Sequence, residues 1–313
     1  MPILLTVILC TRDPHPARLA RTLEGLAGQT LASASWELLL IDNGSSPALH
    51  PRSLPSPGPA LANLRVVPEP VPGLTPARLR GIAEARGDVL VFVDDDNVLA
   101  SGYLAFAASA FASSPRLAAA GGPVRAEFET IPPAWTTEFH GLLALHDHGS
   151  VPLFASGGPG APWPSFAPVG AGLCLRRAAG LDYAARVRAD PARAALDRRA
   201  GQLTSGGDND IVFTALRAGG DVAYLPELAL THLIPTGRVQ PDYLVRLNRA
   251  IQRSWVRVLA LHEACPWRPI PRWTLPLRFA RAWLRACPWR GPAERVRCAG
   301  LIGRLEGQAD LTA

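Results

Sequence analysis

The chain has 313 residues, a formal net charge of +6 and 48% apolar residues. A chain of this length and composition can bury a large core, which excludes an intrinsically disordered protein. All 32 basic residues are Arg, and the modest positive charge is only a weak indication of acidic partners such as phosphates or membrane surfaces.

The cysteine content and the N-terminal residues indicate the cellular compartment in which the protein is expected to lie. Five cysteines are scattered, odd in number and without any Cys-x-x-Cys pair, which indicates a reducing compartment and no zinc site. Residues 1–10 lack a basic n-region and a cleavage site, so they are expected to form a strand and not a signal peptide. No run of about 18 apolar residues occurs, so the sequence predicts no membrane-spanning helix.

Apolar runs and helical patterns alternate from residue 3 to residue 113. The expected strands cover residues 3–9, 36–41, 64–67 and 89–93. The expected helices cover residues 15–26, 75–87 and 101–113. In the second helix Thr75 is the expected N-cap and Pro76 the first helical residue. This alternation is typical of an α/β fold with a mostly parallel sheet flanked by helices.

Three adjacent carboxylates, Asp94, Asp95 and Asp96, follow the fourth expected strand. Thr11 and Arg12 follow the first strand and Asp42 follows the second, so polar groups recur at strand carboxyl ends, where open α/β sheets bind ligands. Adjacent carboxylates repel one another unless a cation neutralises them. Oxygen ligands of this kind suit Mg²⁺ or Mn²⁺, which usually also holds substrate phosphates. A solvated acidic turn is the alternative interpretation.

Two common nucleotide-binding motifs are absent from the sequence. The turn after the first strand, residues 10–14, contains no Gly, which excludes the Gly-x-Gly-x-x-Gly fingerprint of dinucleotide-binding enzymes. The chain contains no Lys at all, which excludes the Gly-x-x-x-x-Gly-Lys phosphate-binding loop. The sequence therefore predicts neither a dehydrogenase nor a P-loop enzyme.

Seven motifs, taken together in their order and spacing, resemble a known family. They are Val7–Arg12, Ile41–Ser45, Gly73–Gly81, Val93–Asp96, Gly121–Val124, Val169–Arg177 and Gly206–Ile211. This set resembles the inverting family-2 glycosyltransferases, which have the GT-A fold. The resemblance implies a GT-A catalytic domain over residues 1–240 and leaves residues 241–313 as a helical C-terminal extension.

The resemblance also implies a role for each matched residue. Six residues would contact a nucleotide-sugar donor: Thr11, Arg12, Asp42, Arg78, Asp94 and Asp95. Asp42 would bond the base, and Asp94 and Asp96 would be the outer acids of the family's Asp-x-Asp motif. Asp96 would bind a divalent metal, Mn²⁺ or Mg²⁺, with His232 as a further ligand. Asp208 would be the general base.

The chemistry of glycosyl transfer calls for these groups. A nucleoside diphosphate leaves with added negative charge, which a carboxylate-bound divalent metal stabilises as a Lewis acid. The attacking acceptor hydroxyl must lose its proton, so a single base such as Asp208 is needed on the opposite face of the sugar. One base without a covalent intermediate gives inversion. Asp208 also stands at an expected helix start, where a carboxylate serves equally as a plain N-cap.

Two positions depart from the family pattern. Gly207 stands where the family often has Glu, so a second carboxylate beside Asp208 is missing from the motif. Leu79 stands where many members have Asn after the Arg. The first departure leaves the orientation of the base open, and the second concerns only the nucleotide side. A loose group of His140, His146 and His148 is interpreted as a polar loop, with a metal site or contact with the acceptor as the alternatives.

The C-terminal extension combines apolar and basic stripes. Residues 242–262 place Leu and Trp on one helical face and Arg on another, and residues 272–289 mix Trp, Leu and Phe with Arg278, Arg281 and Arg285. This pattern suits peripheral contact with a membrane surface. Packing of both stretches on the catalytic domain, with the Arg face in water, is the alternative.

The sequence thus predicts a cytoplasmic glycosyltransferase, peripheral on the cytoplasmic face of a membrane and acting in cell-surface polysaccharide biosynthesis. Its donor would be a UDP-, dTDP- or GDP-sugar and its acceptor a glycan or a lipid-linked hydroxyl. A sugar-nucleotide nucleotidyltransferase and an inactive carbohydrate-binding scaffold are the alternatives. Nucleic-acid binding is not expected, because the Arg stripes lack the interleaved exposed aromatics of a stacking platform.

Overall fold

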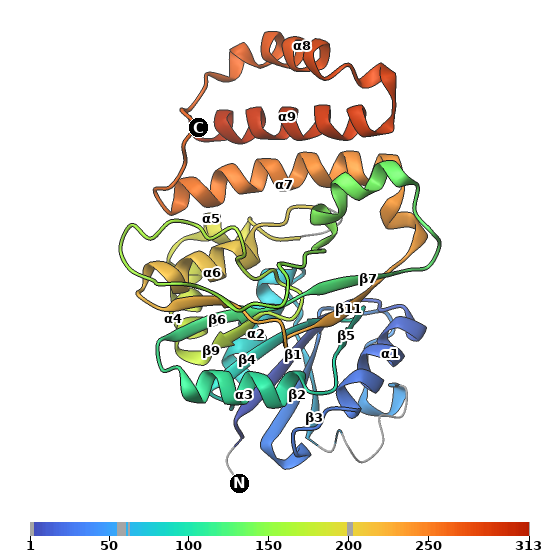
Figure 1. The fold of residues 1–313 in the computed structure, drawn as a ribbon, viewed down its shortest axis with the longest axis vertical. Coiled ribbons are helices and arrows are strands. Elements are labelled where there is room, and N and C mark those ends of the chain that lie inside the picture. The colour runs from blue at the N-terminus through green and yellow to red at the C-terminus, as the bar shows by residue number, and fades with distance from the viewer. Residues whose placement is uncertain (1–2, 55–60, 62, 199–202, 313) are drawn as a thin grey trace. The chain divides into compact units, whose positions relative to one another are not determined.

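The computed structural model describes residues 3–54, 61, 63–198 and 203–312 (Figure 1). The chain divides into two compact units. Unit 1 comprises Met1–Glu127, Ala144–Pro191 and Ile211–Leu233, and unit 2 comprises Phe128–Leu143, Ala192–Asp210 and Ile234–Ala313. The domain boundary expected after residue 240 stays a prediction.

An eight-stranded sheet forms the centre of unit 1. Its order is β3 (Leu64–Pro68), β2 (Trp36–Asp42), β1 (Leu5–Thr11), β4 (Val89–Asp94), β9 (Cys174–Arg176), β6 (Leu117–Gly121), β10 (Asp221–Tyr224) and β8 (Leu153–Ala155). Strands β3, β2, β1 and β4 are parallel neighbours, as are β6 and β10. Strand β9 runs antiparallel between β4 and β6, and β8 antiparallel to β10. The predicted α/β fold with a mostly parallel sheet is confirmed.

Helices accompany this sheet. Three of them, α1 (Pro16–Ala27), α2 (Leu74–Glu84) and α3 (Tyr103–Ser113), lie where the sequence predicts them, whereas α4 (Arg177–Ala189) was not predicted. Helix α6 (Gly207–Arg217) begins in unit 2 and continues into unit 1. Every residue of β2 is buried, as expected for a parallel strand covered on both faces. A second, three-stranded sheet has the order β5 (Asn97–Leu99), β11 (Leu230–Ile234) and β7 (Val124–Phe128).

The start of α2 differs from the prediction. Its N-cap is Gly73, with φ of 135°, so the assignment of Thr75 as N-cap is wrong. The reason lies in Asn43, whose Oδ1 accepts the Gly73 N–H at 2.8 Å and whose Nδ2 donates to the carbonyls of Glu69 and Val71. These bonds fix the chain just before the helix, and only Gly adopts this positive φ without strain.

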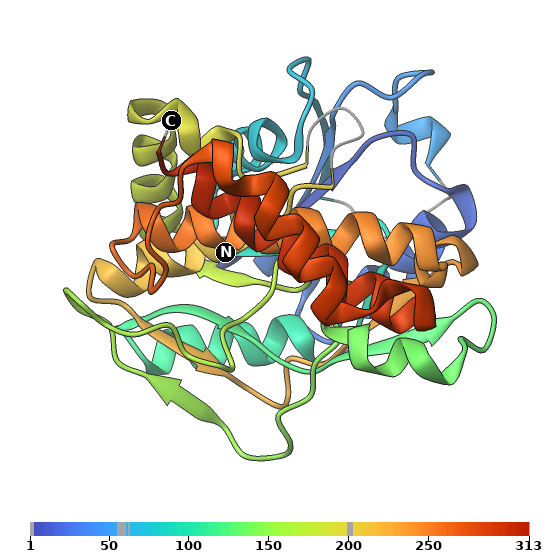
Figure 2. The same cartoon turned by 90° about the horizontal axis from the view of Figure 1, so that it is seen from above.

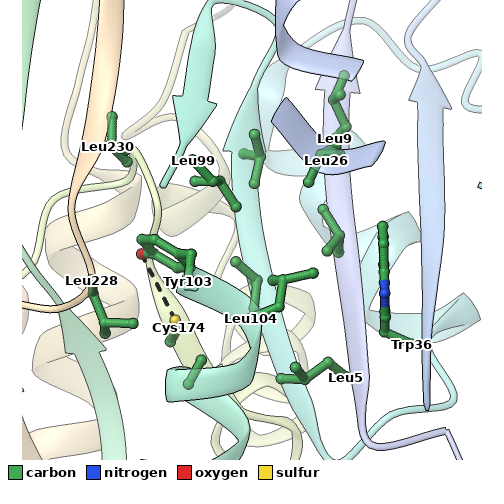
Figure 3. Close-up of a cluster of buried hydrophobic side chains, with 14 of the residues drawn as sticks. Leu5, Leu9, Leu26, Trp36, Leu99, Tyr103, Leu104, Cys174, Leu228 and Leu230 are labelled. Carbon is green, nitrogen blue, oxygen red and sulfur yellow. Dashed lines mark hydrogen bonds between the residues drawn. The ribbon is translucent and has the colours of Figure 1, made fainter. Parts of the chain in front are cut away.

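The core of unit 1 closes around Tyr103 at the start of α3 (Figure 3). Its hydroxyl donates to the carbonyl of Gly172. The Cys174 thiol donates to the hydroxyl oxygen of Tyr103, at 3.9 Å. Burial raises the pKa of Tyr103 well above its ordinary value and raises the pKa of Cys174 to about 12. Both groups therefore stay protonated at neutral pH and serve the packing of the core.

Helices dominate the described part of unit 2. They are α5 (Pro191–Ala194), α7 (Pro241–Leu261), α8 (Leu275–Ala286) and α9 (Pro292–Asp310), joined by short 3₁₀ turns that include Arg272–Thr274 and Pro288–Arg290. Helix α9 lies between α7 and α8 (Figures 1 and 2). The helix predicted over residues 242–262 is confirmed as α7. No helix among the described residues has the length and apolar character needed to cross a bilayer.

Glycines allow α9 to approach α7 closely. A Cβ on Gly303 would lie 2.1 Å from the backbone oxygen of Arg249, and a Cβ on Gly307 would lie 2.7 Å from the Cβ of Val256. Arg249 also pairs with Glu306 of α9, and the next arginine of the same row, Arg253, bonds Asp310 at 2.7 Å. The sequence predicted that these two arginines belong to a basic face of the helix. In the structure they form ion pairs that connect α7 to α9.

Replacing Gly303 by Ala is expected to destabilise the protein, although Ala is the better helix former. The added methyl group meets backbone atoms of α7 that cannot move independently, and overpacking of this kind costs about 1–3 kcal/mol. Thermal unfolding of the purified variant measures the effect. The matched control is Gly141→Ala, because a Cβ there meets no atom within 4 Å. Equal melting temperatures for the two variants would contradict the close contact.

Candidate functional site

The carboxyl ends of three adjacent strands meet in register at one edge of the large sheet. Thr11 at the end of β1 pairs with Asp42 at the end of β2. On the other side of β1, Cys10 pairs with Asp94 at the end of β4. Neighbouring strands lie about 4.8 Å apart, so the three strands end close together, with Asp94 level with Cys10 and one position before the Thr11–Asp42 pair. This edge lies where open α/β sheets bind their ligands.

Asp42 is buried and holds the loop that follows β2. Its two carboxylate oxygens accept the backbone N–H groups of Ser45 and Leu49, each at 2.9 Å. Burial alone would raise the pKa of Asp42, but the hydrogen bonds from Ser45 and Leu49 outweigh it and lower the pKa. Asp42 is therefore an ionised acceptor with fixed geometry at neutral pH.

Thr11 connects β1 to the acidic turn. Its hydroxyl donates to Oδ2 of Asp95, so the side chain predicted to line a nucleotide pocket orients a neighbouring carboxylate. Arg12 follows with its side chain half exposed and lies 3.7 Å from Asp13. Of the two predicted nucleotide contacts on this strand, Thr11 is fixed in place and Arg12 extends toward solvent.

The acidic turn itself is held by Asn97, a fully buried residue that the sequence did not single out. Its Oδ1 accepts the N–H of Asp94 at 3.1 Å, and its Nδ2 donates to Oδ1 of Asp96 at 3.1 Å. Asp94 ends β4, and Asn97 begins β5. The side chain of one buried amide thus sets the conformation of the whole acidic motif.

Antiparallel pairing of β5 with β11 brings His232 to this turn. His232 pairs with Asn97 across the two strands, and its Nε2 lies 3.5 Å from Oδ2 of Asp96. Both side chains are buried. The described residues contain no group of three or more His, Cys, Asp or Glu that could hold a metal ion. Asp96 and His232 bring one carboxylate and one imidazole together, so a metal bound here would need further ligands, such as substrate phosphates and water, and the role of both residues as metal ligands stays a prediction.

Arg78 lies on α2 with its guanidinium over the ring of Phe92, 5.9 Å from the ring centroid. It is buried, although it carries a charge. Phe92 belongs to β4, two residues before Asp94. The helix that carries Arg78 is itself anchored through Gly73 to Asn43, directly after Asp42. The predicted base contact and the predicted arginine are thus connected through one asparagine.

Asp208 lies in the first turn of α6, in the part of that helix that belongs to unit 2. It is half-buried, and its Oδ1 accepts the N–H of Asn209 at 2.9 Å. Acid in the first turn of a helix is favoured by the helix dipole. The predicted helix start is confirmed, whereas the role of Asp208 as a base stays a prediction.

Beside Asp210 of the same motif, three residues of unit 2 that the sequence did not reveal surround this helix start: Arg193, Asp197 and His262. Asp210, fully buried, accepts hydrogen bonds from Arg193 and from His262 Nε2, the latter at 2.7 Å. A Cβ on Gly207 would lie 2.4 Å from Oδ2 of Asp197. The carboxylate of Asp197 therefore occupies the space that a side chain at position 207 would need. The Asp208-x-Asp210 spacing was the only sequence signal for this cluster.

Two of the three histidines of the middle region lie close together. His146 and His148 lie in unit 1 with ring centroids 5.3 Å apart, and His148 stacks edge-on against Tyr224. The Tyr224 hydroxyl donates to Oδ1 of Asp147 at 3.1 Å. Burial lowers the pKa of His146, which favours its neutral form. His140 lies in unit 2.

The close approach of Gly207 to Asp197 allows a prediction about the stability of variants at these two positions. Gly207→Ala should destabilise the protein by about 1–3 kcal/mol, because its methyl group meets the Asp197 carboxylate. Adding Asp197→Ala removes that carboxylate and leaves its Cβ at 3.1 Å, so the double variant should lose less stability than the two single changes together. Urea unfolding of all four proteins measures the coupling. Strict additivity would show that the two positions do not touch.

Comparison with known proteins gives matches to a family and to solved structures. Residues 6–158 match the family model described as glycosyl transferase family 2. A crystal structure of GalNAc-T7 with UDP, GalNAc and Mn²⁺ aligns with a TM-score of 0.53 and 17% identity, over 83% of this chain and 48% of that chain. The chain therefore spans about half the length of that protein, and at this identity the match shows a shared fold alone.

A second solved structure, S. aureus TarS 1-349, aligns over 99% of this chain and 92% of that chain, at 12% identity and a TM-score of 0.46. No curated protein matches the sequence. The family match covers β1, β2 and β4 with their polar ends, and the GalNAc-T7 match covers most of the chain. The resemblance to family-2 glycosyltransferases with the GT-A fold is therefore confirmed, and residues 6–158 carry that family's region.

Proposed function

We propose that this protein transfers a sugar from a nucleotide-sugar donor to an acceptor hydroxyl with inversion. The observation that carries the proposal is the gathering of Thr11, Asp42 and Asp94 at the ends of three adjacent strands. It places a carboxylate on each side of β1, at the edge where a donor nucleotide would lie. The match to family 2 supports glycosyl transfer in general.

The donor side uses the sheet edge. Asp42 accepts a hydrogen bond from the base, and Arg78 on α2 supplies a buried positive charge beside Phe92 of β4. Thr11 and Asp95 form a bonded pair that presents a fixed polar surface to the ribose, and Arg12 extends from the same strand end. Asp94, which ends β4 directly before Asp95, contacts the donor from this neighbouring strand. The structural relative that holds UDP supports a UDP-sugar, with dTDP- and GDP-sugars as the other donors.

A divalent cation, Mn²⁺ or Mg²⁺, fits Asp96 and His232. The relative crystallised with Mn²⁺ supports this choice. When bound, the ion stabilises the negative charge on the leaving diphosphate. Asp96 keeps one oxygen bonded to Asn97 and directs the other toward His232, so the protein holds the two ligands in a buried, fixed arrangement. Second-shell bonds of this kind orient metal ligands.

The acceptor side uses the start of α6. Asp208 removes the proton of the attacking hydroxyl, and one base of this kind without a covalent intermediate inverts the anomeric centre. The buried Asp210, held by Arg193 and His262, fixes the helix turn from which Asp208 extends. The acceptor is a glycan or a lipid-linked hydroxyl, and the enzyme works in the cytoplasm in cell-surface polysaccharide biosynthesis.

Two other functions remain distinguishable by product. A nucleotidyltransferase would release pyrophosphate from a nucleoside triphosphate, whereas a glycosyltransferase releases a nucleoside diphosphate. An inactive carbohydrate-binding scaffold would release neither. The glycine-free turn after β1 disfavours the nucleotidyltransferase, and the intact acids Asp94, Asp96 and Asp208 disfavour the scaffold.

Donor binding is expected to require both the metal and Asp96. Titration of UDP, dTDP and GDP into the protein with Mn²⁺, followed by calorimetry, should reveal one preferred nucleotide, and chelation or Asp96→Ala should abolish its binding. Asp88→Ala is the matched control, since Asp88 is an exposed acid just before the opposite end of β4. Unchanged affinity in the chelated protein would refute the metal site.

Asp208→Asn is expected to reduce transfer by a factor on the order of 100 or more, because the amide keeps the shape of the side chain but cannot accept a proton. Donor binding should persist. Product formation from the preferred nucleotide-sugar measures the rate. Asp242→Asn is the control, since Asp242 is likewise an acid in the first turn of a helix of unit 2. Near-normal turnover of Asp208→Asn would assign the base to another residue.

A further inference from the structure

Positive charge is concentrated in the arginine segment, residues 264–291 of unit 2. This segment contains six of the 32 Arg residues and none of the 26 acidic residues. Its charge therefore equals the net charge of the whole chain, and the remaining residues balance one another. All six arginines are exposed: Arg268, Arg272, Arg278, Arg281, Arg285 and Arg290.

The same segment exposes large apolar side chains. Relative exposures are 83% for Trp273, 68% for Leu277, 62% for Leu284, 57% for Trp289 and 49% for Trp283. The rings of Trp283 and Trp289 contact each other, with centroids 4.6 Å apart. Single exposed apolar residues are ordinary, but five within 17 positions form a patch that calls for a partner.

Helix α8 carries three rows of side chains along its length. The first row packs toward α9, where Ala282 is buried and Leu275, Phe279 and Ala286 are half-buried. The second row is exposed and apolar, with Trp273 of the preceding turn, Leu277, Ala280 and Leu284. The third row is exposed and basic, with Arg278, Arg281 and Arg285. The apolar surface of α8 is thus wider than the contact with α9 covers.

Nearby acids do not neutralise the basic row. Glu306 of α9 pairs with Arg249, and Asp310 pairs with Arg253 and Arg272. Glu294, at the other end of α9, pairs with Arg297. Within the described residues, Arg278, Arg281 and Arg285 have no carboxylate within 4.0 Å; Arg278 instead bonds the Thr274 hydroxyl at 2.9 Å. Three guanidinium groups therefore retain their charge for an outside partner.

A cleft of about 620 Å³ lies beside the basic row, between α8 and α9. Arg281, Arg285 and Arg304 line it together with Leu301 and Leu305. Guanidinium groups bind phosphate oxygens in bidentate fashion, and the leucines offer apolar contact next to them. The cleft has room for an anionic headgroup at the side of the helix.

We infer that the arginine segment docks on a membrane surface rich in anionic phospholipid. An interfacial helix needs an apolar face, a basic face and aromatic anchors, and α8 with its flanking turns has all three side by side. Trp residues favour the level of the headgroups. The inference uses none of the proposed catalytic residues, so it is tested independently of glycosyl transfer.

The arrangement favours a bilayer over nucleic acid. Strand recognition uses aromatic rings that stack on successive bases within a basic groove. Here the exposed apolar row contains aliphatic Leu277 and Leu284, and it runs beside the arginines instead of between them. The Leu and Trp side chains would contact the apolar layer of a bilayer, and the parallel row of arginines would contact the charged headgroups above it.

Flotation of the full-length protein with vesicles tests the inference. Vesicles of phosphatidylcholine with 30% phosphatidylglycerol are expected to carry the protein at low salt, and pure phosphatidylcholine vesicles are not. Raising the salt concentration should weaken the association, because the electrostatic part is screened. Arg278→Gln, Arg281→Gln and Arg285→Gln combined should reduce the partition coefficient on the order of a hundredfold.

A control of equal charge separates the surface from the net charge. Arg52→Gln, Arg86→Gln and Arg188→Gln combined remove three exposed arginines outside the segment and should leave binding unchanged. Leu277→Gln with Leu284→Gln tests the apolar row and should also weaken flotation; circular dichroism checks that each variant folds. Equal binding by the two arginine triples, or no flotation with anionic vesicles, would overturn the inference. The inference would also be overturned if the protein did not float with vesicles but formed dimers or bound an oligonucleotide, and if Leu277→Gln with Leu284→Gln abolished that binding.

Discussion

The candidate site depends first on one constraint, the register of three parallel strands. Because Thr11 pairs with Asp42 and Cys10 with Asp94, the polar residues that end β2, β1 and β4 reach the same edge together. A shift of one residue in either pairing would turn every side chain of a strand to the opposite face. Every residue of β2 is buried and all of β1 except the partly buried Cys10, which makes such a shift costly, so the core determines the geometry of the site.

The same edge must also hold several carboxylates without mutual repulsion. Each is given its own donors: Asp42 receives two backbone N–H groups, Asp95 the hydroxyl of Thr11, and Asp96 the amide of Asn97. Hydrogen bonds to a carboxylate favour its charged form, as the lowered pKa of Asp42 shows. Hydrogen-bond donors thus orient each of these three carboxylates before any ligand is bound.

The sequence predicted those parts of the fold that depend on local patterns. Continuous apolar runs identified β1, β2 and β4, and the helical spacing of Leu244 and Leu247 identified α7. Local patterns could not predict that His232 lies beside Asp96, because this contact depends on the antiparallel pairing of β5 with β11. Helix α9 was not predicted, because its sequence contains several glycines and has no clear amphipathic pattern. The structure shows that these glycines allow close packing against α7. Asn43 likewise displaced the predicted cap of α2 from Thr75.

Position 207 shows why a departure from a family motif is better judged in space than along the chain. The sequence alone suggests that a carboxylate beside Asp208 has been lost, since Gly stands where the family often has Glu. In the folded chain the carboxylate of Asp197 lies against that glycine, so closely that even a methyl group at position 207 would collide with it. Gly207 and Asp197 are therefore mutually dependent, and a Glu at 207 would be incompatible with the present position of Asp197. The structure places an acidic group at this turn from a position ten residues earlier in the chain.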